Sequence, residues 1–192
     1  MILKWTYFKT SKRLRQPCTE VILVSFRCTQ WLTVSLAGTD TTTSVLHTCI
    51  LNLVLNPEIQ SRAHTELDAV LGSPTSSTFR LPTHDDRPHL PYIEALLKES
   101  MRWMPVAATG IPHFTTEADK YRGWRIPKGS IVFANAWGML HDENMYPDPF
   151  VFRPERFLES EKNSQEPDPA NTGAFGFGRR YVVIVSLCMT RS

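Results

Sequence analysis

The sequence predicts a mainly α-helical domain with a small β portion. Apolar side chains recur at helical spacing over residues 91–104, and prolines stand at the ends of the helix-like segments. Residues that favour strands occur only in short runs between positions 111 and 136. The chain has 192 residues, 42% of them hydrophobic and 21% charged, which is typical of one sizeable globular domain.

Three helices are expected before residue 105. An apolar, threonine-rich stretch from Thr29 to Leu55 predicts one long, largely buried helix that ends at Asn56-Pro57. A second, amphipathic helix is expected to begin at Pro57 and to stop at Gly72. The third begins at Pro91 and ends before Pro105, with an apolar stripe made by Ile93, Leu96, Leu97, Met101 and Met104.

The second half of the chain is expected to be less regular. Residues 73–90 predict a connecting loop with one short helical turn. The runs Ile111–Thr115, Tyr121–Ile126 and Ser130–Ala136 predict strands, with hairpin turns at Arg122-Gly123 and at Pro127-Lys128-Gly129. Prolines scattered over residues 146–173 favour an extended meander.

Composition excludes several classes of function. The net charge is +2 and no dense basic face with interleaved aromatics occurs, so nucleic acid is not an expected partner. The four cysteines lack CxxC spacing, which argues against a disulfide framework or a structural zinc site. The apolar run of Val21 to Val24 with Phe26 is too short for a signal peptide or a membrane span, which leaves a transit role or a poorly specified terminus.

Three polar groups have an ordinary explanation and a functional one. Glu99 and Arg102 lie three residues apart on one helical face, a spacing typical of a solvent-facing ion pair. His84-Asp85-Asp86 with His89, and His141-Asp142-Glu143, contain residues that bind metals, but both stand where turn-forming side chains are expected. A metal-dependent hydrolase would require these two clusters to converge.

Four strings occur in a specific order along the chain. They are Ala37-Gly38-Thr39-Asp40-Thr41-Thr42, Glu99-x-x-Arg102, Pro154-Glu155-Arg156-Phe157, and Phe175-Gly176-Phe177-Gly178-Arg179-Arg180. Together they resemble the oxygen-binding helix, the ExxR helix, the PERF meander and the start of the haem-ligand loop of cytochromes P-450, the haem-thiolate monooxygenases, and in particular a fungal-like member. The resemblance covers residues 29–180 and implies a partial cytochrome P-450 fold with haem (heme) as the cofactor.

The resemblance implies roles for the first string. The small side chains of Ala37 and Gly38 would let a flat cofactor approach the helix backbone closely. Asp40 and Thr41 would be the acid and the alcohol of a proton relay that serves oxygen activation, and the Thr41 hydroxyl could widen the helix by bonding back to a carbonyl. A buried threonine-rich helix with Asp40 at a kink is the simpler alternative.

The remaining strings imply a structural network and a haem-binding loop. Glu99, Arg102 and Arg156 would form a buried charge network that fixes the meander. The basic residues His113 and Arg180 would pair with the haem propionates, although His113 could equally be an ordinary strand residue. Phe175 and Gly178 would belong to the loop that contacts the cofactor.

The pattern departs from the family at the iron ligand. The ligand position, two residues after Arg180, holds Val182, and valine has no lone pair to offer iron. Cys188 stands six residues further along in an apolar run and is a poor substitute. An abrupt loss of similarity at one residue is what an unspliced intron or a frameshift would produce.

The sequence therefore predicts three segments: an unassigned stretch over residues 1–28, a partial domain over 29–180 and an aberrant tail over 181–192. The expected activity is that of a monooxygenase inserting one atom of O₂ into a small organic substrate, with an NADPH-dependent reductase as partner. This form is expected to be inactive, and the alternative is a non-catalytic product that acts as a reductase-binding decoy. Family members of this type are anchored to the endoplasmic reticulum, but no anchor is recognised here.

Overall fold

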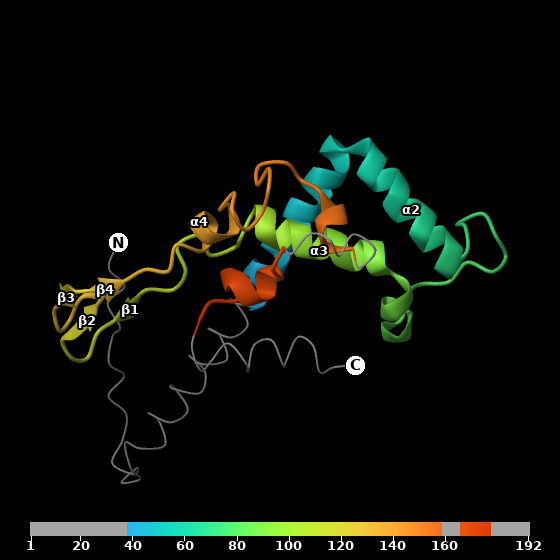
Figure 1. Cartoon of the computed structure of the whole chain (residues 1–192). Coiled ribbons are helices and arrows are strands. Elements are labelled where there is room, and N and C mark those ends of the chain that lie inside the picture. The colour runs from blue at the N-terminus through green and yellow to red at the C-terminus, as the bar shows by residue number, and fades with distance from the viewer. Residues whose placement is uncertain (1–37, 159–165, 178–192) are drawn as a thin grey trace, which may run out of the picture. The chain divides into compact units, whose positions relative to one another are not determined.

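The computed structural model describes residues 38–158 and 166–177 (Figure 1). The chain divides into two units, residues 1–40 and 41–192, and residues 38–40 are the described part of the first. Residues 38–55 are helical. The later elements are α2 (Pro57–Leu71), η1 (His84–His89), α3 (Pro91–Trp103), β1 (His113–Phe114), β2 (Asp119–Tyr121), β3 (Trp124–Ile126), β4 (Ile131–Val132), α4 (Ala136–Leu140), η2 (Pro154–Phe157) and η4 (Ala170–Ala174). The predicted class, mainly α with a small β portion, is confirmed.

Prolines and a glycine set the limits of α2 and α3 as predicted. Pro57 and Pro91 occupy the first helical turn, where no partner for an amide proton is needed. Gly72 ends α2 with a φ of 84°, and a Cβ there would lie 2.9 Å from the Thr78 Oγ1 atom. Glycine is therefore required at this stop both by conformation and by space.

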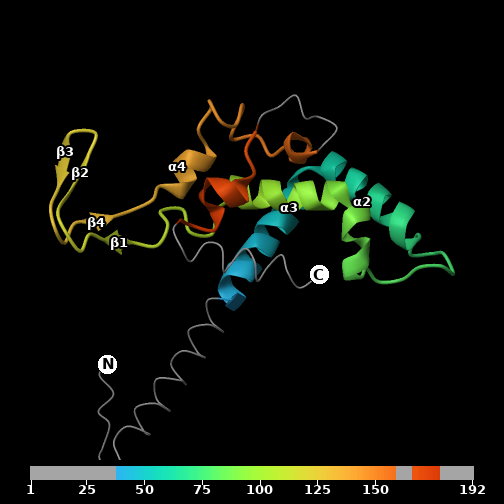
Figure 2. The ribbon, with the colours of Figure 1, turned by 60° about the horizontal axis from the view of Figure 1, so that its bottom comes forward.

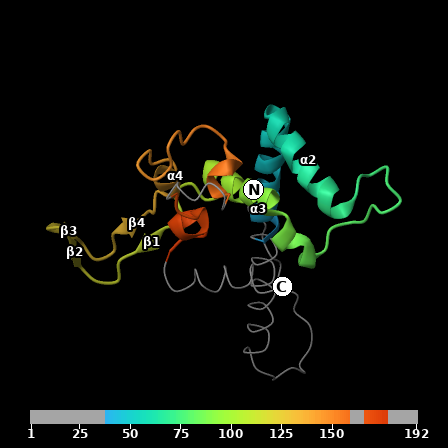
Figure 3. The same ribbon diagram turned by 45° about the vertical axis from the view of Figure 1, so that its right-hand side comes forward.

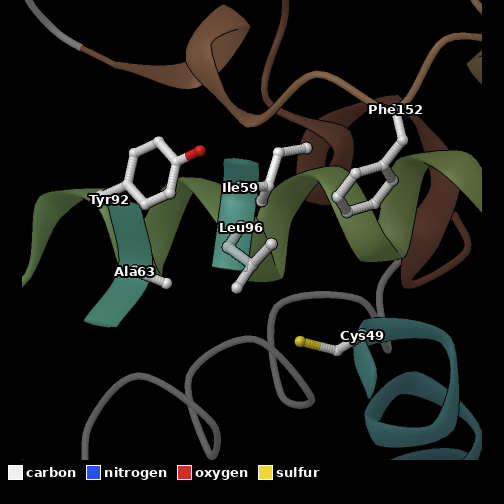
Figure 4. Close-up of a cluster of buried hydrophobic side chains, with 6 residues drawn as sticks. All are labelled: Cys49, Ile59, Ala63, Tyr92, Leu96 and Phe152. Atoms are coloured by element: carbon white, nitrogen blue, oxygen red, sulfur yellow. The ribbon is translucent and has the colours of Figure 1, made fainter. Parts of the chain in front are cut away.

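Helix α3 is the centre of the second unit. It contacts α2, α4, η1, η2 and η4, and Figure 2 shows it running among these elements. A compact hydrophobic cluster forms where α3 meets α2, the helical residues 41–55 and the chain before η2 (Figure 4). Its buried members are Cys49, Ile59, Ala63, Tyr92, Leu96 and Phe152.

The helix over residues 38–55 is less buried than the sequence suggested. Within the described part, only Thr48, Cys49 and Asn52 are buried, whereas Ile50, Val54 and Leu55 are 58–68% exposed. The expectation of a largely buried helix is therefore wrong for these residues. The core cluster takes up one face of the helix, and the apolar side chains on its other faces remain open.

The strands form two antiparallel pairs in a long ribbon (Figure 1). β2 and β3 are joined by Arg122-Gly123, whose φ angles of 48° and 86° suit a tight hairpin turn, as predicted. β4 pairs with β1, not with β3, so the hairpin expected at Pro127-Lys128-Gly129 is wrong. The reason is that this turn is bonded to Thr115, the residue directly after β1. Gly129 N donates to Thr115 O at 2.8 Å, and Thr115 Oγ1 donates to Pro127 O.

Two further elements differ from expectation. The strand predicted over Ser130–Ala136 ends at Val132, and Ala136 begins the short helix α4 instead. Asn135 stabilises this start because its side-chain oxygen accepts a hydrogen bond from Gly138 N at 3.0 Å. The meander contains two short helical turns, η2 and η4, so it is only partly extended.

Across the two described ranges, no helix has both the length and the hydrophobicity that crossing a membrane requires.

Candidate functional site

The Glu99 carboxylate is the centre of a buried charge network. Arg102 donates to it twice, from Nε to Oε2 at 2.7 Å and from Nη2 to Oε1 at 2.9 Å. Arg156 donates from Nε to Oε1 at 3.2 Å, and the backbone N–H of Arg153 donates to the same oxygen at 2.9 Å. The three side chains expected to converge, from α3 and η2, lie within hydrogen-bonding distance.

The remaining guanidinium nitrogens hold the meander. Arg102 Nη1 donates to Leu140 O at 3.0 Å, at the end of α4. Arg156 Nη1 donates to Pro147 O at 3.1 Å and Nη2 to Val151 O at 3.2 Å. Two arginine side chains thus hold the chain after α3 at three backbone carbonyls, those of Leu140, Pro147 and Val151.

A fourth charge completes the network. The Glu166 Oε2 atom accepts from Arg156 Nη1 at 2.6 Å, and the Glu166 side chain is 4% exposed. Glu99, Arg102 and Arg156 are 0% exposed, so the buried set has two carboxylates and two guanidiniums and no net charge. Such balance is required, because a buried charge without a partner costs several kcal/mol. The alternative of a solvent-facing Glu99–Arg102 pair is therefore wrong.

The segment that leads to the haem-loop motif is tied to this network. Lys98 Nζ lies 2.9 Å from Asp168 Oδ2, and the other Asp168 oxygen accepts from Ala170 N at 2.9 Å. The Tyr146 hydroxyl lies 2.9 Å from Pro167 O and 3.1 Å from Thr172 Oγ1, while Arg102 stacks over the Tyr146 ring at 5.5 Å. Burial raises the pKa of Tyr146, so this hydroxyl remains a neutral hydrogen-bonding group.

Among the predicted relay residues, Asp40 and Thr41 are helical and exposed. Residues 38–42 are continuous α-helix, so no new helix starts at Thr39. A Cβ on Gly38 would meet nothing within 4 Å, which leaves the backbone open on that side. The relay itself stays a prediction.

The predicted cofactor contacts are only partly within the described residues. His113 is exposed on β1, opposite Val132 of β4. Phe175 follows η4 and is half-buried. The other residues assigned to the iron or the cofactor, Ala37, Gly178, Arg180, Val182 and Cys188, lie outside the described residues.

The two polar clusters considered for metals have other contacts. Asp86 accepts two hydrogen bonds from Arg80, at 2.6 and 2.7 Å, and the Arg80 guanidinium holds the pKa of that carboxyl well below its usual range. The His141 ring stacks on Trp137 with ring centroids 4.4 Å apart. No group of three or more His, Cys, Asp or Glu residues suited to a metal occurs in the described ranges.

Sequence reasoning missed two contributors to the site. Glu166 is part of no recognised string, and its only local signal is a place just before Pro167-Asp168-Pro169. Glu66 of α2 accepts from the backbone amides of Tyr92 and Ile93 at 2.8 and 3.0 Å, and so caps the start of α3. A cap supplied from 26 residues earlier leaves no trace in the local sequence.

Comparison with known proteins gives a consistent result. The sequence pattern described as cytochrome P-450 matches residues 28–181. The cytochrome P-450 monooxygenase claR of Ampulloclitocybe clavipes is 51% identical over 143 residues, which is 74% of this chain and 26% of that protein. The monooxygenase ple1 of Rhodocybe pseudopiperita is 51% identical over 149 residues, covering 77% of this chain and 27% of that protein.

Solved structures agree with these sequence relatives. A zebrafish cytochrome P-450 in a structure with abiraterone superposes with a TM-score of 0.64 at 34% identity. The match covers 79% of this chain and 33% of the zebrafish chain. The chain thus spans about a quarter to a third of the length of the proteins it matches.

Proposed function

The chain belongs to the cytochrome P-450 family, and on that premise we propose that it derives from a haem-dependent monooxygenase and is catalytically inactive in this form. The parent reaction is the insertion of one atom of O₂ into a small organic substrate. Electrons for it come from an NADPH-dependent reductase. Substrate, reductase and haem are the partners that membership of the family implies.

The observation that carries the family assignment to the site is the buried network around Glu99. It joins the ExxR helix to the PERF turn through Arg156, at 3.2 Å. The same network then reaches the segment before the Phe175 motif through Glu166. Motifs that lie far apart in the sequence are therefore parts of one bonded unit.

The donor set of this chain does not fit a thiolate-ligated haem. The position that supplies the ligand in the family holds Val182, whose side chain has neither a lone pair nor an ionisable proton. Cysteine thiolate donates electron density to the iron, and neither histidine nor methionine replaces it in this chemistry.

Within this proposal, the partial family domain covers residues 29–180, between an unassigned segment over 1–28 and an aberrant tail over 181–192. Asp40 and Thr41 keep the relay positions of the family. The cofactor-binding positions in this proposal are Ala37, Gly38, His113, Phe175, Gly178 and Arg180. Their function depends on a ligand that residue 182 does not provide.

The test is the absorption spectrum of the reduced carbon monoxide complex. Purified 192-residue chain mixed with haem is expected to bind it weakly and to lack the red-shifted band of thiolate ligation, because no cysteine stands at the ligand position of the family. A Cys188→Ser variant is the matched control and is expected to give the same spectrum. A thiolate band in the parent that disappears in the Cys188→Ser variant would show that Cys188 has taken over the ligand role, and the proposal of inactivity would fall.

A further inference from the structure

One side of α3 forms an apolar groove that the buried network does not use. Leu90 lines it from the N-cap of α3, and Ile93, Leu97 and Met101 from one half-buried face of that helix. Ala170 of η4 and Phe175, which follows η4, line the other side. Its volume is about 400 Å³. Figure 3 shows the η4 segment, in red, beside α3, and these are the two elements that contribute most of the lining.

The charged groups at the rim of the groove are already paired. Arg87 donates to both oxygens of Glu94, at 3.1 and 2.9 Å. Lys98 pairs with Asp168 at 2.9 Å. Since these four rim charges are neutralised among themselves, the groove favours an uncharged, apolar occupant.

A segment of this chain has that character and follows the groove-lining residue Phe175 closely in the sequence. The described chain ends at Phe177, two residues after the lining residue Phe175. Residues 181–190 contain no charged side chain, and residues 182–185 read Val-Val-Ile-Val. Val182 stands five positions after Phe177, and the five residue steps between them reach up to about 17 Å when extended.

The length of the groove matches the length of the apolar segment. Ile93 and Met101 are eight residues apart on α3, so the apolar floor is about 12 Å long. About four residues in extended form, or about eight in helical form, cover such a length. The uncharged residues 181–190 are enough for either form. We propose that the apolar tail, residues 181–192, docks in the groove formed by α3 and η4 and covers it.

This inference is independent of the proposed function. It concerns how the tail packs, whether or not any haem is bound. Burial of the half-buried stripe on α3 against Val182–Val185 would remove apolar surface from water on both sides, which is the dominant favourable term in such packing.

The experiment measures the accessibility of a thiol placed in the groove. The parent is the full 192-residue chain with Leu97→Cys, in which Cys18 and Cys28 are changed to Ser and Cys49 and Cys188 to Ala. Its rate of alkylation by iodoacetamide is compared with that of Glu58→Cys, an exposed site on α2, in the same background. Each rate is divided by the rate of the same variant unfolded in urea, so that the ratio reports how far the fold protects the thiol. The thiol at position 97 is expected to react at least about tenfold more slowly.

Two matched variants identify the occupant. Changing Val182, Val183, Ile184 and Val185 to Ser is expected to raise the rate at position 97 to near that at position 58. Changing the equally apolar run Val21, Ile22, Leu23 and Val24 to Ser is expected to leave protection unchanged. A fast rate in the parent, or protection that survives serine at 182–185, overturns the proposal. Protection that appears only at high protein concentration overturns it in favour of a second copy.

A second measurement does not depend on those serine variants. With Cys188 kept as the native thiol and Met101→Cys introduced, mild oxidation of dilute protein is expected to give an intramolecular disulfide, detected by mass spectrometry of the digested chain. Glu58→Cys in the same background is expected to give none. Equal yields at positions 58 and 101 would contradict docking of the tail.

Discussion

At the residue scale, the buried Glu99 carboxylate is the most constrained group described. It accepts hydrogen bonds from two arginine side chains and from the Arg153 amide. No buried side-chain polar atom in the described ranges lacks a hydrogen-bond partner. A network this complete loses its balance when any one member is removed.

Replacing Glu99 with Gln is expected to lower the free energy of unfolding by about 3–5 kcal/mol, because Arg102 would lose the carboxylate it bonds and the buried set would keep two guanidiniums but a single carboxylate, Glu166. Urea denaturation followed by circular dichroism measures the change. Glu94→Gln, on the same helix but 31% exposed, is the matched control and is expected to cost about 1 kcal/mol or less. Equal small losses for both variants would contradict a fully buried network.

The Asp86 carboxylate, in the segment before α3, makes the stability of the fold depend on pH. Arg80 and the Thr83 amide hold the pKa of Asp86 below its ordinary value of 3.8. A lowered pKa in the folded state means that stability is full above 3.8 and falls as the pH drops through the folded-state value.

Asp86→Asn is therefore expected to flatten the acid limb of the stability profile, measured by urea denaturation at a series of pH values from neutral downward. Arg80→Gln removes the partner and is expected to flatten the same limb. If the Asp86→Asn profile ran parallel to that of the parent, the ion pair would have no part in the acid sensitivity.

At the element scale, α3 presents its faces in an unexpected way. The polar pair of the ExxR string is completely buried, while Ile93, Leu97 and Met101 of the apolar stripe are only half-buried. The helix is therefore held by charge-assisted hydrogen bonds on one side and by packing of Tyr92 and Leu96 in the core cluster on another. The leucine side chain at the cap position, Leu90, cannot accept a hydrogen bond. The start of α3 therefore depends on Glu66 of α2, which accepts from the first amides of the helix.

Glu66→Ala is expected to cost about 1 kcal/mol of stability, as is usual for a lost helix cap. Hydrogen exchange of the Tyr92 and Ile93 amides is expected to accelerate, because both lose their acceptor. Glu66→Gln keeps one side-chain oxygen and is expected to cost less. His64→Ala, an exposed change on the same helix, is the control. Unchanged exchange at both amides in Glu66→Ala would rule out this cap.

At the scale of the whole molecule, much apolar surface is open. The ribbon carries Ile111, Trp124 and Ile131 at 66–77% exposure, and the helix over residues 38–55 carries Val54 at 68%. Isolated two-stranded ribbons are marginally stable in water. The chain corresponds to 26–30% of the length of its monooxygenase relatives, so it holds a limited share of the surfaces that complete the family fold.

Restoring the iron ligand alone is expected not to restore activity. In the 192-residue chain, Val182→Cys supplies a thiol, but most of the length that shapes a substrate pocket in the relatives is not matched by this sequence. Turnover is measured as reductase-dependent consumption of NADPH with product formation, and Val182→Ser is the matched control. Activity of Val182→Cys above that of Val182→Ser would show that these 192 residues suffice for catalysis.

The sequence by itself determined the class of fold, the limits of α2 and α3 and the family. Proline at helix starts and glycine at a helix stop act through local backbone geometry, so Pro57, Gly72 and Pro91 could be interpreted without a structure. The proposal that position 182 supplies no iron ligand is likewise a matter of residue chemistry, because a valine side chain cannot donate to a metal in any conformation.

Only the tertiary structure decided which surfaces are buried and which segments pair. Helical spacing showed that Glu99 and Arg102 are neighbours, but their burial depends on Arg156 and Glu166, which arrive from more than fifty residues away. The Glu66 cap and the pairing of β4 with β1 likewise depend on groups distant in sequence. Local patterns report the backbone preferences of neighbouring residues, whereas burial and pairing follow from contacts that form only when the chain folds back on itself.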